Sequence, residues 1–167
     1  MLFSTLEGLK RFKIPHKFNV VSIISLYAQW IREGRLKVDP AWNTEGLKFT
    51  VQDPCKLVRQ GLGDPVAEDL RFVIKQVCGE ENFVDVWPNK SNNYCCGGGG
   101  GALQAGFNDN RRKHGRMKFE QLHATGADVV ITPCHNCHTQ IKDLAEHYGG
   151  KWQATHLWNW IVKALVR

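Results

Sequence analysis

Short apolar runs alternate with amphipathic segments from residue 47 to the end of the chain. The apolar runs predict strands at 47–52, 83–87 and 128–132. Segments with helical spacing predict helices at 65–77, 108–124, 136–147 and 156–165, the last preceded by an extended piece from residue 152. Strand alternating with helix is typical of an α/β fold, so we predict a Rossmann-like layered domain with a mainly parallel sheet.

The first 46 residues contain no cysteine and resemble the end of the chain. Residues 18–31 and 152–161 both combine a short extended piece with an amphipathic helix, and in the first of them Val20, Ile24, Tyr27 and Ile31 share one helical face. One interpretation makes 1–46 the tail of a preceding α/β half-domain and 47–167 a complete cysteine-rich domain. A plain amphipathic core helix is the alternative.

Composition and charge narrow the possible classes of protein. The chain has 167 residues, 43% of them hydrophobic, and a formal net charge of +6, which suits one globular domain. The basic residues gather at 10–17 and in the run Arg111, Arg112, Lys113, Arg116, Lys118, which we interpret as solvated surface rather than a nucleic-acid site. No stretch is apolar enough to span a bilayer and no signal peptide is recognisable, so we expect a cytoplasmic protein.

The six cysteines change this picture most. In a reducing compartment a chain of this size needs no disulfides, which favours metal or redox chemistry. Five of them form three groups: Cys55, then after 39 residues Cys95–Cys96, then after 37 residues Cys134 and Cys137. Each group follows a predicted strand. Because the carboxyl ends of parallel strands share one edge of a sheet, we expect the three groups to meet there.

Thiolates are the ligands preferred by iron–sulfur clusters and by zinc. Several thiolates buried together repel one another unless a metal offsets their charge. The glycine run that begins at Gly97 and Gly98 lacks a side chain on the backbone, so its amide groups can approach sulfur closely. These two glycines therefore join the five cysteines as predicted cofactor-binding residues.

Other interpretations of these residues stay open. A structural zinc site needs four ligands, and a redox-active dithiol explains only Cys134 and Cys137. Cys78, outside the spacing pattern, is better explained as a small buried hydrophobic residue. The histidines are candidates for catalytic proton donors but equally for ordinary helix and capping residues; they are His135, His138 and His156.

The three cysteine groups also resemble a known family. Asp53-Pro-Cys55, Tyr94-Cys-Cys-Gly and Thr132-Pro-Cys-His-Asn-Cys137 are similar to the cysteine-rich CCG domain family, in which the spacer after the vicinal pair is slightly shorter. A loop tolerates that difference. The stretches 61–70 and 92–96 are most similar to the iron–sulfur subunit associated with dissimilatory sulfite reduction. The resemblance runs from Phe18 to the C-terminus.

This resemblance implies a noncubane 4Fe–4S cluster held by Cys55, Cys95, Cys96, Cys134 and Cys137, although some domains of the family bind zinc. In heterodisulfide reductase the cluster is where the disulfide is cleaved. Larger relatives carry a ferredoxin-like part and an earlier half-domain, which implies that this chain is a fragment or one piece of a split subunit. The implied partners are other subunits of a redox complex, including a ferredoxin-like electron donor, which would also provide any attachment to the inner membrane.

Two functions follow as expectations. The first is a redox module that passes electrons through the cluster to a small disulfide, a polysulfide or a protein-bound sulfur substrate. The second is a structural or docking module of a multi-subunit electron-transfer complex, in which zinc or a cluster only stabilises the fold. Nucleic acid is not an expected partner.

Overall fold

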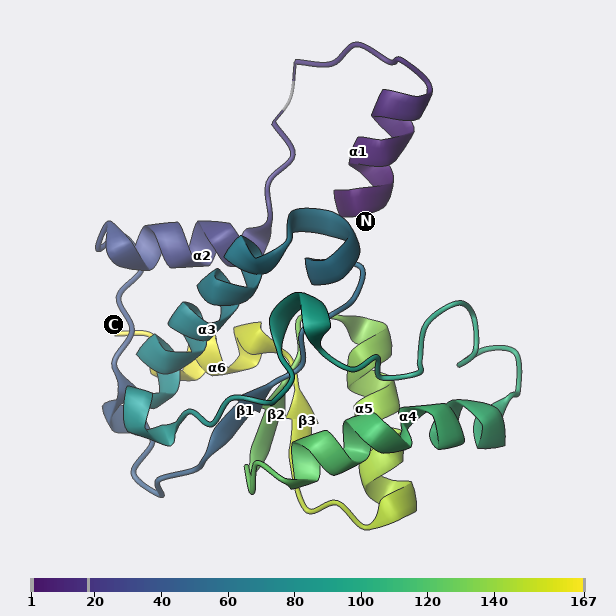
Figure 1. Cartoon of the computed structure of the whole chain (residues 1–167). Coiled ribbons are helices and arrows are strands. Elements are labelled where there is room, and N and C mark those ends of the chain that lie inside the picture. Colours follow the sequence, from purple (N-terminus) through teal and green to yellow (C-terminus); the bar gives the residue numbers. More distant parts are fainter. Residues whose placement is uncertain (1, 18, 167) are drawn as a thin grey trace.

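The computed structural model describes residues 2–17 and 19–166, and its centre is a sheet of three parallel strands (Figure 1). The strands β1 (Phe49–Val51), β2 (Val129–Ile131) and β3 (Gln153–Thr155) lie in the order β1-β2-β3. In register, Val51 pairs with Ile131 and Ile131 with Thr155, so the three carboxyl ends lie together. The predicted α/β fold with a mainly parallel sheet is confirmed, and all three strands are parallel.

Helices cover both faces of this sheet. Figure 1 shows α3 (Asp64–Cys78) and α6 (Leu157–Ala164) on one side and α4 (Asn108–His123) and α5 (His135–Tyr148) on the other. Every residue of β1 and β2 is buried, as expected for parallel strands enclosed between two helical layers. The predicted helices over 65–77, 108–124, 136–147 and 156–165 are each confirmed within one or two residues.

Local sequence explains where these helices begin and end. Pro65 stands in the first turn of α3, where its missing N–H costs nothing, and Gly79 follows the helix with a φ of 89°. Gly149 ends α5 in the left-handed conformation, a position that favours glycine. The helices α4 and α5 are joined by Asp143, whose carboxylate binds the guanidinium groups of both Arg111 and Arg112.

The predicted strand at 83–87 is wrong. Phe83 makes a single parallel bridge to Phe49, and the N–H of Val84 donates to the carbonyl of Phe49 at 2.8 Å. The next residue, Asp85, turns its carboxylate to the guanidinium of Arg71 on α3 instead of continuing the ladder. The segment therefore leaves the sheet after one residue, and the sheet ends at β1.

The N-terminal part contains the helices α1 (Leu2–Arg11) and α2 (Ile23–Arg32) and the 3₁₀ turn η1 (Pro40–Trp42). The helix α1 had no sequence signal that we recognised, whereas α2 falls where an amphipathic helix was expected. Ser22 caps α2 by accepting the N–H of Ile24, and α2 packs on α3. Phe18, where the resemblance to the family begins, lies outside the described residues. The domain boundary after residue 46 stays a prediction.

One aromatic group anchors the core beside β1. The fully buried ring of Phe49 packs edge-on against Trp42 and Trp160, with ring centroids 6.1 and 4.9 Å away. Burial of such a side chain contributes about 2–3 kcal/mol. Cys78 is also fully buried among apolar side chains, which confirms the prediction that it is a small core residue. In the part of the chain that the structure describes, no helix has the length and apolar character needed to cross a membrane.

A single-turn π-helix, η2 (Val58–Leu62), and two short 3₁₀ turns, η1 (Pro40–Trp42) and η4 (Lys90–Asn92), complete the elements used below. The π-helix lies between the end of β1 and the start of α3, in contact with η4 and with α1. It was not predicted from the sequence. Its position matters because it begins three residues after Cys55, at the carboxyl edge of the sheet.

Candidate metal centre

The five cysteines of the spacing pattern lie at the carboxyl edge of the sheet. Cys55 follows β1 after the segment Gln52-Asp53-Pro54, and Cys134 follows β2 directly before α5. Cys137 lies in the first turn of α5, and the vicinal pair Cys95–Cys96 lies in the loop between η4 and α4. Parallel pairing of β1 with β2 brings the first and third groups side by side, as the sequence predicted.

The thiol groups meet in a continuous row. The Sγ atoms of Cys96 and Cys137 are 3.4 Å apart. The thiols of Cys55 and Cys95, of Cys95 and Cys96, and of Cys137 and Cys134 are also close enough to shift one another's pKa. Three separated segments of the chain are thus joined through sulfur in the order 55, 95, 96, 137, 134. The convergence expected from the sequence is present, while the roles of these residues as ligands stay a prediction.

Contacts between the thiols lower the pKa of some of them and raise the pKa of others. The hydrogen bond with Cys137, followed by backbone amides at the start of α5, lowers the pKa of Cys134 to about 6. Hydrogen bonds with Cys55 and Cys96 likewise lower the pKa of Cys95. The complementary hydrogen bonds and burial raise the pKa of Cys55 and of Cys137. Some thiols of the row are therefore set up as thiolates and others hold their protons.

Backbone amides of the glycine run donate to two of these sulfurs. The N–H of Gly97 points to the Sγ of Cys95 and that of Gly98 to the Sγ of Cys96, each at 3.4 Å. Gly97 has a φ of 84°, a conformation that a residue with a side chain rarely adopts. A Cβ at Gly98 would lie 2.7 Å from the Cβ of Gln140 on α5. The close approach of amides to sulfur expected from the sequence is therefore present at both glycines.

The donor set fits a group of several metal and sulfur atoms. Five soft thiols in a row, two of them receiving amide hydrogen bonds, match the ligands and the surroundings that iron–sulfur clusters require. Within residues 2–17 and 19–166, no three Cys, His, Asp or Glu side chains are arranged around one point as a single metal ion requires. The five thiols of the row are the residues that would hold such a group.

A layer of buried polar side chains lies beneath the thiols. Asp53 binds the guanidinium of Arg71 through both oxygens, at 2.8 and 2.9 Å, and accepts the backbone N–H of Lys90 at 2.7 Å. Gln52 and Lys118 are also buried, and Gln52 Nε2 lies 3.9 Å from the Sγ of Cys137. Asp53 therefore holds the chain in place two residues before Cys55.

The interpretation of the basic run as solvated surface is wrong for two of its members. Arg111 is buried, where it binds Asp143 and Gln140, and Lys118 is completely enclosed. Both lie on the face of α4 that packs inward. Lys113 and Arg116 are exposed as expected. Burial lowers the pKa of Lys118 to about 7, although the charges of Asp53 and Cys96 act in the opposite direction.

The three histidines named from the sequence lie next to one another. The rings of His138 and His156 stack with centroids 4.5 Å apart, and His135 lies 6.2 Å from His156. Nδ1 of His156 is 3.1 Å from the carbonyl of Thr132, at the end of β2. Burial, and next the charge of His156, lowers the pKa of His138. Their proton-donor role stays a prediction.

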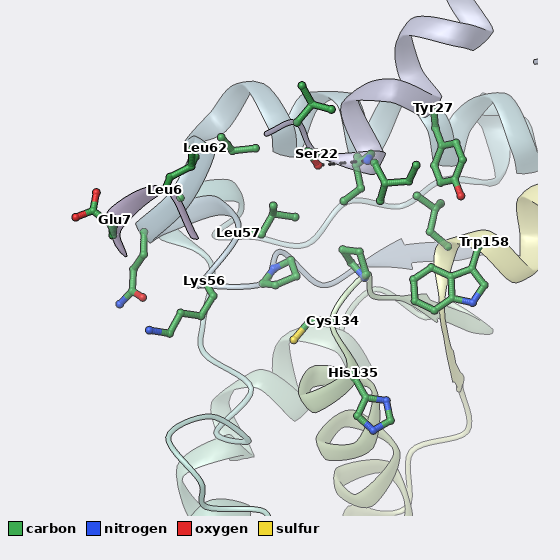
Figure 2. Close-up of a pocket in the computed structure, with 18 residues that line it drawn as sticks. Leu6, Glu7, Ser22, Tyr27, Lys56, Leu57, Leu62, Cys134, His135 and Trp158 are labelled. Carbon is green, nitrogen blue, oxygen red and sulfur yellow. Dashed lines mark hydrogen bonds between the residues drawn. The ribbon is translucent and has the colours of Figure 1, made fainter. Parts of the chain in front are cut away.

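A largely apolar pocket of about 830 Å³ opens beside the thiols (Figure 2). Figure 2 shows Cys134 and His135, at the start of α5, at one end of this pocket. Its apolar wall includes Leu57, Leu62 and Trp158, and α1 contributes Leu6 and Glu7. Sequence analysis did not find this pocket, because its walls come from five separate segments whose apolar residues resemble ordinary core positions.

The comparison with known families bears directly on these cysteines. The profile of the cysteine-rich domain known as CCG matches residues 49–142, which is more than half of the chain and includes all five cysteines of the row. The chain belongs to the cysteine-rich CCG domain family. CCG domains are typical of heterodisulfide-reductase-like iron–sulfur redox proteins. A search of curated proteins finds no match.

Membership in the CCG family agrees with the geometry. The matched region begins at β1 and ends within α5, so it contains the strands β1 and β2 and every thiol of the row. The pocket walls supplied by α1, α2 and α6 lie outside the matched region. The matched region therefore contains the whole thiol row and the part of the pocket wall that comes from residues 54–62 and 133–135.

Proposed function

We propose that this chain is the iron–sulfur redox module of a heterodisulfide-reductase-like oxidoreductase. The observation that carries the proposal is the row of five thiols from three separate segments, in which Cys96 and Cys137 are 3.4 Å apart. The ligands of a noncubane 4Fe–4S cluster would be Cys55, Cys95, Cys96, Cys134 and Cys137. Held by these residues, such a cluster would supply electrons one at a time.

The residues of this chain would hold the substrate and supply protons. A disulfide takes up two electrons and two protons to give two thiols. The pocket beside Cys134 offers an apolar site of a size that suits a small-molecule substrate. His135 also lines this pocket and stands next to His156, so it is the candidate that protonates the leaving thiolate. A disulfide or polysulfide is the substrate class that this chemistry supports.

The electrons would come from partner subunits. We propose a ferredoxin-like donor within a larger complex, of the kind associated with dissimilatory sulfite reduction, with contact to the inner membrane only through that complex. Nucleic acid is not proposed as a partner, because Arg111 and Arg112 of the basic run are bound to Asp143. Among the exposed cations of this run, Arg116 is paired with Glu120.

The experiment is an anaerobic purification of the full chain with iron, sulfide and zinc measured per chain. The proposal expects iron and sulfide in equal amounts, broad visible absorption, and a paramagnetic state that appears on oxidation or reduction. Replacement of any one of the five cysteines by alanine should remove or alter these signals. A colourless protein that contains zinc and no sulfide would overturn the proposal in favour of a structural module.

Cys78→Ala is the matched control for those variants. Cys78 is as buried as Cys96 but belongs to the core, where its Sγ lies 3.3 Å from the carbonyl of Gly79. Its loss should cost about 1–2 kcal/mol of stability and leave the iron and sulfide content unchanged. If Cys78→Ala removed iron as efficiently as Cys137→Ala, the assignment of the five ligands would be wrong.

A further inference from the structure

Lys118 is a buried cation whose charge is not balanced by the side chains that it contacts. Its side chain is completely buried on the inward face of α4. The ammonium group donates to two neutral oxygens, Oδ1 of Asn93 at 2.5 Å and Oε1 of Gln121. A buried ammonium is costly unless negative charge lies nearby. These contacts serve two of the three N–H groups of the ammonium and do not balance its charge.

The carboxylate that acts on the charge of Lys118 is already paired with another cation. Asp53 binds Arg71 through both of its oxygens, and Arg71 also binds the partly exposed Asp85. The other groups that act on the charge of Lys118 are the thiols of Cys96, Cys137 and Cys95, which become negative when they lose their protons or bind a metal. The thiol row is therefore the remaining counter-charge that this fold places beside Lys118.

A chain of buried amides connects the ammonium to the row. Lys118 donates to Oδ1 of Asn93, Nδ2 of Asn93 donates to Oε1 of Gln52 at 3.5 Å, and Nε2 of Gln52 points to the Sγ of Cys137 at 3.9 Å. Every donor in this relay is directed toward the sulfur. All four side chains are buried, so water does not screen the interaction.

We propose that Lys118 is a positioning cation for the thiolate centre. Its positive charge acts through the hydrogen bonds of Asn93 and Gln52 on Cys137 and favours the more negative, reduced state of the bound cluster. This inference rests on the proposed function, since it concerns the same five ligands. It goes further because it assigns the control of the reduction potential to a residue outside the ligand set. Asn93 and Gln52 are positioning residues in the same sense.

The test is a reductive titration with dithionite of the anaerobic, cluster-containing full chain, followed by its visible and EPR spectra. Lys118→Met removes the charge and keeps the length of the side chain. We expect the equilibrium constant for one-electron reduction to fall at least about tenfold, which is about 59 mV toward more negative potential. Gln52→Met keeps the cation but breaks the relay, and it should move the potential in the same direction by less.

Lys113→Met is the matched control. It removes the same charge from the same helix, but Lys113 is exposed and its charge is screened by water. Its equilibrium constant for one-electron reduction should stay within about twofold of the wild-type value. Equal effects of Lys113→Met and Lys118→Met would overturn the proposal, as would an unchanged potential in Lys118→Met.

Asn93→Asp covers the case in which Lys118→Met does not retain the cluster. Aspartate has the shape of asparagine, so it keeps the contact with Lys118 while it cancels the charge of the ammonium. Its potential should become more negative by a similar amount, and an unchanged value would contradict the proposal. Failure of the proposed function is distinguishable from these results, because the wild-type chain itself would then contain no iron or sulfide.

Discussion

Gly98 on the loop after the vicinal cysteines and Gln140 on α5 pack so closely that a Cβ on Gly98 would lie 2.7 Å from the Cβ of Gln140. The same Cβ would lie 3.0 Å from the carbonyl oxygen of Asn136. Neither neighbour can move without displacing α5, which carries two of the thiols. The contact therefore fixes the distance between the loop of Cys95–Cys96 and the helix of Cys137.

Gly98→Ala should destabilise the protein and weaken retention of iron. We expect a loss of about 1–3 kcal/mol in the free energy of unfolding, since the extra methyl group overpacks a close contact. Gly99→Ala is the control, because that residue is exposed and a Cβ there meets nothing within 4 Å. Urea unfolding and iron content measure both effects. Equal results for the two variants would show that the close contact does not matter.

Arg71→Met should be among the most destabilising substitutions in the chain. It would leave Asp53, whose side chain is fully buried, without its bidentate partner, at a cost of about 3–5 kcal/mol. Arg116→Met removes an exposed i,i+4 ion pair with Glu120 and should cost less than about 1 kcal/mol. Chemical denaturation of the metal-free proteins tests this difference, and a similar cost for both would contradict it.

The burial of Lys118 predicts a dependence of stability on pH in the metal-free protein. Its pKa falls from 10.5 to about 7 on folding, so between these values the unfolded chain holds the extra proton. Stability due to Lys118 should therefore rise with pH in this window, by at most about 1.4 kcal/mol for each pH unit. Below a pH of about 7 both states hold the proton, and the cost of burying the charge is felt in full.

Lys118→Met isolates this contribution from that of the thiols, which also titrate. The difference in unfolding free energy between wild type and variant, measured under reducing conditions at several pH values from about 7 to 10, should change in favour of the wild type as pH rises. A difference that stays constant with pH would show that Lys118 does not lose its proton in the folded state.

The apolar pocket predicts where a larger side chain would interfere with binding of the substrate. Val21 lines the pocket and is 47% exposed, so Val21→Trp should narrow the pocket without disturbing the core. We expect a raised KM for reduction of a small disulfide, with iron and sulfide unchanged. Val162→Trp is the control, since Val162 on α6 is 66% exposed and does not line the pocket. An unchanged KM in Val21→Trp would remove the pocket from the proposed function.

Cysteine spacing and strand–helix alternation were enough to predict the strands β1 and β2 and the meeting of the thiols. The carboxyl ends of β1 and β2 carry Cys55 and Cys134, and parallel pairing alone brings them together. The segment at 83–87 has the apolar pattern of a strand but leaves the sheet, because Asp85 pairs with Arg71. Such an ion pair between distant residues has no signature in a local pattern.

The buried face of α4 explains why Lys118 was not predicted. The inward residues Arg111, Gly115, Lys118, Gln121 and Leu122 follow helical spacing, but only the last is a large apolar residue. A pattern method that equates apolar with buried assigns this face to solvent. The helical spacing of these residues places them on the same face as Leu122, and this was the signal in the sequence. It indicates burial only once the partners Asn93 and Asp143 are known.

Gln52 and Asp53 follow β1 and direct their side chains to opposite layers of the fold. Gln52 reaches Cys137 on α5, whereas Asp53 binds Arg71 on α3. These two consecutive residues therefore connect the two helical layers by side-chain contacts. Cys55 lies two positions further along the chain. The position of the first cysteine of the row is therefore set by both helical layers at once.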